Sequence, residues 1–116
     1  MITIQESYNY LVGALEYLDP KKLELSNDDL EYYIFEELQG DATSFLHEWT
    51  VDRLISGNRI PENLKVAIFE LRKRIFNVMN STNSIEFYRK DIQWQEVRHE
   101  AMRILQEIKS YQNNNI

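Results

Sequence analysis

The stretch from residue 61 to residue 80 constrains the fold most, because its apolar side chains recur with the period of an α-helix. The apolar positions are Leu64, Ala67, Ile68, Leu71, Ile75, Val78 and Met79. Side chains three and four residues apart stack on one face of a helix. Phe69 and Phe76 lie together beside this face and widen the apolar surface. A helix with so much apolar surface has to be covered on more than one side, which predicts a domain built around it.

Start and stop signals indicate further helices before and after this stretch. Thr3 and Glu6 have the spacing of a capping box, which marks a helix start, and Ser26 opens a second pattern of the same kind. Gly40 and Gly57 are of the residue type that most often follows a helix end. The helices predicted from these signals and from the apolar spacing are residues 4–18, 27–39, 42–56, 61–80 and 85–111.

The last of these helices has a shifted pattern. Its apolar spacing runs to Ile92 and then continues on a different stripe from Val97. A single helix whose buried face changes fits this pattern, and so does a short helix to about Lys90 followed by a second one from Asp91. We expect the single helix.

No segment alternates between apolar and polar residues as a half-buried strand does. Short connections between consecutive amphipathic helices favour antiparallel neighbours. The fold predicted is therefore all-α, a compact single-domain bundle of about five helices around a central helix at 61–80. We expect the domain to span residues 1–111 and residues 112–116 to form a frayed C-terminal tail.

The composition narrows the class of protein. The chain contains no cysteine, which excludes disulfide bonds and thiolate chemistry. Its first ten residues lack the basic and apolar segments of a secretory leader, and no apolar run approaches the ~20 residues of a membrane-spanning helix. We expect a cytoplasmic protein without a membrane partner.

The charged residues are distributed unevenly. Residues 1–57 carry twelve acidic and three basic side chains, a net charge of −9, whereas residues 58–116 have a net charge of +3. An acidic surface attracts basic proteins and repels nucleic acid at long range. A solvated acidic surface that only keeps the protein soluble explains the asymmetry equally well.

The candidate catalytic and metal-binding patterns are incomplete. Glu96 and His99 have the spacing of one Glu-x-x-His pair of a helical di-iron site, but His47, the other histidine, has Ser44 where a second glutamate would stand. No serine lies in a Gly-x-Ser-x-Gly turn, and the three glycines form no phosphate-binding loop. We expect no metal, no cofactor and no enzymatic activity.

The segment from residue 27 to residue 37 is the most suggestive surface. If Leu30, Ile34 and Leu38 face the core, the aromatic and acidic side chains between them share an outer face. Large aromatic side chains surrounded by carboxylates suit the binding of a basic protein, although a neighbouring helix could also cover them. The partner-binding residues predicted here are Asp28, Asp29, Glu31, Tyr32, Phe35 and Glu36.

Residues 29–33, Asp-Leu-Glu-Tyr-Tyr, resemble the Asp-Leu-x-Tyr-Tyr stretch of the acidic helical immunity proteins that neutralise nuclease colicins. The resemblance covers five residues, and Ile34 stands where that family has proline. It implies a basic toxin as partner, bound by the side chains of Asp29, Tyr32 and Tyr33. Together with the charge, it favours a small non-catalytic inhibitor or immunity-type protein that masks a basic partner such as a nuclease toxin.

The alternative function uses the basic clusters at 72–74 and 89–90. If their side chains converged on one face, the protein could be a regulator associated with nucleic acid or another polyanion. Helices 27–39 and 42–56 have the outline of a helix-turn-helix. The second of them offers Glu48 and Asp52 against the single base Arg53, however, so DNA recognition by it is not expected.

Overall fold

The computed structural model describes residues 2–114, and every regular element within that range is helical. In chain order the elements are α1 (Ile4–Glu16), the 3₁₀ turn η1 (Pro20–Glu24), α2 (Asn27–Glu31), the π-helical η2 (Tyr32–Leu38), α3 (Gln39–Phe45), α4 (Glu48–Ser56), the 3₁₀ turn η3 (Glu62–Leu64), α5 (Lys65–Asn80), α6 (Ile85–Lys90) and α7 (Ile92–Asn114). Elements α2, η2 and α3 follow one another without interruption, and residues 27–45 are called the acidic helix below. The predicted all-α single-domain bundle is confirmed.

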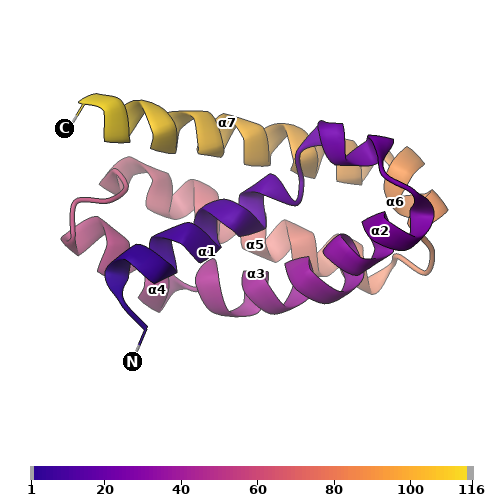
Figure 1. Ribbon diagram of the computed structural model, residues 1–116, viewed down its shortest axis with the longest axis horizontal. Helices are drawn as coiled ribbons and strands as arrows, with labels where there is room; N and C mark the ends of the chain where they lie inside the picture. Colours follow the sequence, from indigo (N-terminus) through magenta and orange to yellow (C-terminus); the bar gives the residue numbers. More distant parts are fainter. Residues whose placement is uncertain (1, 115–116) are drawn as a thin grey trace.

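The bundle measures 40 × 28 × 23 Å along its principal axes, and α1 and α5 lie on opposite sides of it. Figure 1 shows α1 in front, α5 behind and α7 along the upper edge. Each of α3, α4 and α7 contacts both α1 and α5, so the core lies between these two helices. The outer face of α5 is open to solvent, where Val66 is 71% exposed.

Aliphatic side chains from all the longer helices fill the core. Leu11 of α1, Ile34 of the acidic helix and Ile75 of α5 are fully buried. The largest buried side chains are Trp94 and Tyr88, whose rings meet edge to face with 4.7 Å between centroids. The apolar spacing of residues 61–80 therefore predicted the buried face of α5 correctly.

The two predicted helix starts are confirmed by hydrogen bonds. The Thr3 hydroxyl accepts from the Glu6 backbone N–H at 3.0 Å, and the Glu6 carboxylate accepts from the Thr3 N–H at 3.1 Å. The Ser26 hydroxyl accepts from the Asp29 N–H at 3.2 Å. These caps satisfy backbone donors that a helix start leaves without a partner.

The predicted helix end at Gly40 is wrong, because the acidic helix runs through this residue to Phe45. Two carbonyls in the last turn of the acidic helix accept hydrogen bonds from another helix. Arg72 of α5 donates to the carbonyls of Ala42 at 3.0 Å and Thr43 at 3.2 Å. Helix α4 then starts after His47, whose Nδ1 accepts from the Trp49 N–H at 3.1 Å. The break is therefore set by a tertiary contact and lies six residues after the glycine.

Replacing Arg72 with alanine should lower the free energy of unfolding by about 1–3 kcal/mol, because the partly buried carbonyl of Ala42 and the exposed carbonyl of Thr43 both lose a charged donor. Lys73 is the matched control, since it is exposed and the described contacts of its ammonium, with Glu70 and the Phe69 ring, stay on its own helix. Lys73→Ala should change stability by less than about 0.5 kcal/mol. Urea denaturation followed by circular dichroism measures both variants, and equal losses would contradict this role of Arg72.

The single helix expected over 85–111 is also wrong. Asp91 is extended, with ψ of 135°, and separates α6 from α7. Its carboxylate accepts from the Trp94 N–H at 3.1 Å, so Asp91 caps the start of α7.

Helix α7 also extends past the predicted end at 111, as far as Asn114. Its last turn is held by Gln112, whose side-chain amide donates to the Arg59 carbonyl at 2.6 Å. Residues 112–114 are thus helical rather than part of a frayed tail. Asn115 and Ile116, the rest of that predicted tail, lie outside the described residues.

Candidate functional site

The acidic helix carries six carboxylates and neither lysine nor arginine. Within residues 2–114, ion pairs form only at acidic side chains that lie outside this helix. Those side chains are Glu48, Asp52, Glu70, Glu96, Glu100 and Glu107. The negative charge of the acidic helix is therefore not neutralised by ion pairs with the described part of the chain.

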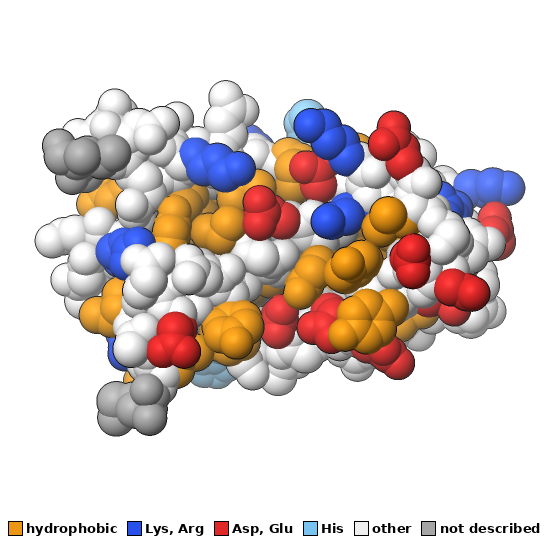
Figure 2. Space-filling view, viewed as in Figure 1, with side chains coloured by type: hydrophobic (Ala, Val, Ile, Leu, Met, Phe, Trp, Pro, Cys, Tyr) orange, Lys and Arg blue, Asp and Glu red, His pale blue; other side chains and the backbone are white. Residues whose placement is uncertain are grey.

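Three fully buried residues, Leu30, Ile34 and Leu38, anchor the acidic helix to the core. A hollow of about 290 Å³ lies on its outer side and is called the acidic hollow here. Its lining residues are Asp28, Glu31, Tyr32, Phe35 and Glu36. Figure 2 shows hydrophobic side chains among carboxylates where this helix runs along the lower edge of the molecule.

The aromatic residues of the acidic hollow differ in their exposure. Tyr32 is 49% exposed, whereas Phe35 is half-buried and packs against the core. Tyr32 lies at the start of the π-helical segment, in which residues five apart are one turn apart. Glu37 is five residues further on, and the hydrogen bond to its carboxylate raises the pKa of Tyr32. The π-helical spacing thus brings the Glu37 carboxylate to the Tyr32 hydroxyl, although Glu37 does not line the hollow.

The structure brings together five of the six residues predicted to bind a partner. Asp29 is exposed but does not line the acidic hollow, although its neighbour Asp28 does. Tyr33, which the resemblance also implies, is half-buried on the side of the acidic helix that faces Tyr17, at the end of α1. Its ring stacks on Tyr17 with 5.5 Å between centroids, and Lys22 Nζ lies 5.2 Å from the ring centre.

Glu37 and Asp41, which were not among the predicted binding residues, extend the negative surface toward Tyr17 at the end of α1. Burial raises the pKa of Tyr17, and the nearby carboxylates of Asp41 and Glu37 raise it further. Residue 41 falls between two separate predicted helices, at 27–39 and 42–56. Because the acidic helix continues through Gly40, Asp41 lies one turn after Glu37 on the same face.

Replacing Asp41 with asparagine should stabilise the protein at pH 7. Burial raises the pKa of Asp41, and the Glu37 carboxylate adds to the effect. The Asp41 carboxyl therefore stays protonated to a higher pH in the folded state than in the unfolded state. The stability contributed by the protonated carboxyl is lost as the pH rises through its folded-state pKa. The urea concentration at the midpoint of unfolding should be higher for Asp41→Asn than for the unmodified protein at pH 7. The two midpoints should converge below about pH 3. A less stable variant at pH 7 would contradict this sign.

The basic clusters do not converge on one face. Arg72 donates to carbonyls of the acidic helix, Lys73 pairs with Glu70, and Arg74 pairs with Glu96. Arg89 donates to Asn27 and to two carbonyls near η1. Lys90 alone among these five cations has no partner within the described range. This arrangement disfavours a phosphate-binding surface made by these clusters.

The remaining candidates for chemistry are not assembled into a site. Glu96 of the Glu-x-x-His pair bonds to Arg74 at 2.9 Å. Nowhere in residues 2–114 do three histidine, aspartate or glutamate side chains gather as a metal ion would require. None of the helices described has the length and apolar character needed to cross a membrane.

Comparison of the chain with protein-family models, with curated proteins and with solved structures finds no match. Function is therefore inferred from the geometry and charge of the chain itself.

Proposed function

We propose that the protein is a non-catalytic binding protein that masks a basic protein partner with its acidic helix. The proposed class is an inhibitor or immunity-type protein acting in the cytoplasm, and a nuclease toxin is the partner that the resemblance in residues 29–33 implies. The partner is held by contact alone, without a covalent step.

One observation carries this proposal: six carboxylates on one helix form no ion pair with residues 2–114, and three of them line a hollow together with a half-exposed tyrosine. Like charges so close together repel one another, and a basic partner would relieve that repulsion. A surface that served only solubility would not require an exposed aromatic side chain in a hollow. Exposed tyrosines in such places are typical of the residues that dominate binding energy.

The acidic hollow suits a lysine or arginine side chain from the partner. The aliphatic stem of such a side chain would pack against Phe35 and the Tyr32 ring, since long cationic side chains bury their stems on apolar surface. Its charged end would lie among the carboxylates of Asp28, Glu31 and Glu36. Covering the basic residues with which a nuclease holds its substrate would block it by occlusion.

Capture of the partner from the native source, followed by its identification, tests the proposal when it is done with charge-matched variants. Glu36→Lys reverses a charge in the acidic hollow, and Glu62→Lys makes the same change in the exposed turn before α5. We expect a basic protein that the unmodified chain and Glu62→Lys retain and that Glu36→Lys loses. An acidic partner, or equal retention by both variants, would overturn the proposal.

The alternative, a regulator bound to nucleic acid, is tested separately. We expect labelled DNA and RNA not to bind at micromolar protein in low salt, where phosphate contacts are strongest. Binding that weakens steeply with salt and is lost in Lys90→Glu would favour the alternative.

A further inference from the structure

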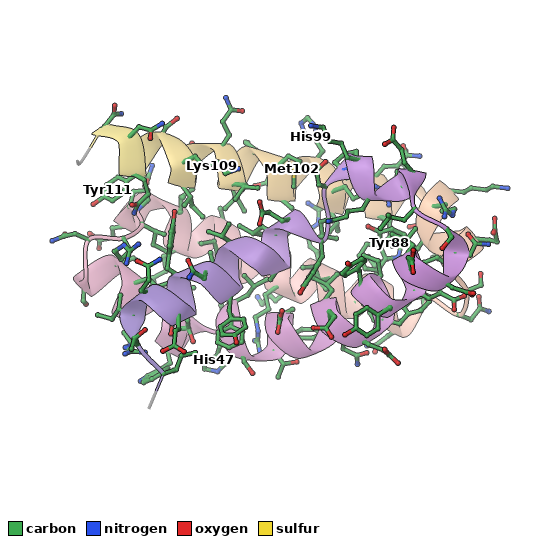
Figure 3. All side chains as sticks on the ribbon, in the orientation of Figure 1. His47, Tyr88, His99, Met102, Lys109 and Tyr111 are labelled. Atoms are coloured by element: carbon green, nitrogen blue, oxygen red, sulfur yellow. The ribbon has the colours of Figure 1, made fainter. Side chains whose placement is uncertain are left out.

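A second hollow, of about 380 Å³, shares no residue with the acidic hollow and has the opposite character. It lies between η1, α6 and the first half of α7, and Figure 3 shows His99 and Met102 on α7 beside the segment that joins α1 to the acidic helix. The residues that matter for its chemistry are Leu23, Arg89, Gln95, Arg98, His99 and Met102. We call it the basic hollow, because the described residues that line it include no aspartate or glutamate.

Arg89 is held rigidly at this hollow by neutral partners. Its guanidinium donates to the carbonyls of Leu23 at 2.6 Å and Leu25 at 2.8 Å, and to the Asn27 side chain at 3.0 Å. Three of its five N–H groups are thus used, which leaves two. Within residues 2–114 it forms no ion pair, and its link to a carboxylate runs through Asn27, whose amide donates to Glu86. Its positive charge is therefore only partly compensated.

Arg98 lies deeper, with only 3% of its surface exposed. It donates to the carbonyls of Tyr88 at 2.9 Å and Arg89 at 3.5 Å, and its guanidinium carbon lies 4.8 Å from the centre of the Tyr88 ring. No carboxylate pairs with it in the described part of the chain. A buried charge that lacks an opposite charge is costly, and carbonyl dipoles at the end of α6 offset only part of that cost. An anion in the hollow would offset more of it.

We propose that the basic hollow binds a small organic anion, a carboxylate or a phosphate monoester carried on a short apolar body. The anionic group would be attracted by Arg89 and Arg98 and would accept hydrogen bonds from their free N–H groups and from the exposed His99 ring. The apolar body would pack against Leu23 and Met102. The volume lies within the range of about 300–1,000 Å³ that small-molecule sites occupy.

This site is independent of the proposed masking of a basic protein, because its charge has the opposite sign and its residues are different. If Arg89 served only to join α6 to η1, and Arg98 only to join α7 to α6, the hollow would have no preference for anions. Binding measurements separate these two roles.

The test is a titration of the ¹⁵N-labelled full chain, monitored by amide chemical shifts. Phenyl phosphate and hexanoate are the probes, hexanamide is the uncharged analogue, and inorganic phosphate lacks the apolar body. We expect saturable shifts for both organic anions at residues 21–25 and 87–103, weaker binding of inorganic phosphate, and no shifts with hexanamide. Absence of saturable binding by either organic anion at millimolar concentration would overturn the proposal, and so would equal binding of hexanamide.

A matched pair of variants on α7 distinguishes the hollow from general electrostatic attraction. His99→Glu places a carboxylate beside the two guanidinium groups, and this exposed residue can be changed without disturbing the core. Lys109→Glu makes a larger charge change on the same helix outside the hollow (Figure 3). His99→Glu should weaken hexanoate binding by about tenfold or more, while Lys109→Glu should change it by less than about twofold. Equal weakening by both variants would show that only net charge matters and would overturn the assignment to this hollow.

Discussion

Replacing Trp94 with alanine should lower the free energy of unfolding by about 3–5 kcal/mol, the range found when a large aromatic core residue is truncated. Trp94 is fully buried and packs edge to face on Tyr88. Its indole N–H also donates to the Thr82 hydroxyl at 2.8 Å, so the change leaves both a cavity and an acceptor without its donor. A loss of this size is a large share of the total stability of a small domain.

The other tryptophan provides the control. Trp49 is 64% exposed on α4, and Trp49→Ala should change the free energy of unfolding by less than about 1 kcal/mol. Urea denaturation monitored by circular dichroism compares the two variants without depending on tryptophan fluorescence. Similar losses in both, or a larger loss for Trp49→Ala, would contradict the packing assigned to Trp94.

The buried faces of the helices were predictable because burial follows local periodicity. Ile68, Leu71 and Ile75 recur at helical spacing, and all three are buried in the structure. The capping residues Thr3 and Ser26 were predictable for a similar reason, since each bonds to a backbone N–H three residues away. Interactions of such short range are encoded within a few residues of sequence.

The positions of the two helix breaks were not predicted, for different reasons. The acidic helix ends where Arg72 reaches its carbonyls from thirty residues away in sequence, a contact that no local pattern indicates. Gly40 lies inside the helix, and a Cβ atom added there would meet no atom of another element within 4 Å, so no close packing requires a glycine at this position. The break at Asp91 did have local signals: the shift of the apolar stripe, and an aspartate three residues before Trp94 that can cap a helix.

The residues of the candidate sites were also predictable only where local spacing, and not tertiary packing, places them. Residues of the acidic hollow all come from one helix, so the inward direction of Leu30 and Ile34 was enough to place five of them together. Tyr17 could not be included, because its position beside Tyr33 depends on how α1 packs against the acidic helix. The basic hollow combines η1 with α6 and α7, more than sixty residues apart in sequence, and its charge arises only on folding.

Removing the Tyr32 side chain should weaken the complex with the basic partner by about 2–4 kcal/mol, the size of effect seen at residues that dominate an interface. Tyr32 offers a large, half-exposed ring in the acidic hollow, and the contacts of such a ring are made only after the partner has docked. Tyr32→Ala should therefore act mainly by speeding dissociation. Trp49→Ala is the control, since it removes a more exposed aromatic ring outside the hollow and should leave the dissociation rate unchanged.

Glu36→Gln should lower the association rate constant. It removes one negative charge from the acidic hollow and keeps the shape of the side chain, so the long-range attraction of a basic partner is reduced while most contacts remain. Association should slow, and its dependence on salt should become shallower, because fewer charges are screened. Stopped-flow measurements with the identified partner across a range of salt concentrations give both rate constants for each variant. If Tyr32→Ala leaves dissociation unchanged, or if association is indifferent to salt and to Glu36→Gln, the partner does not bind at the acidic hollow.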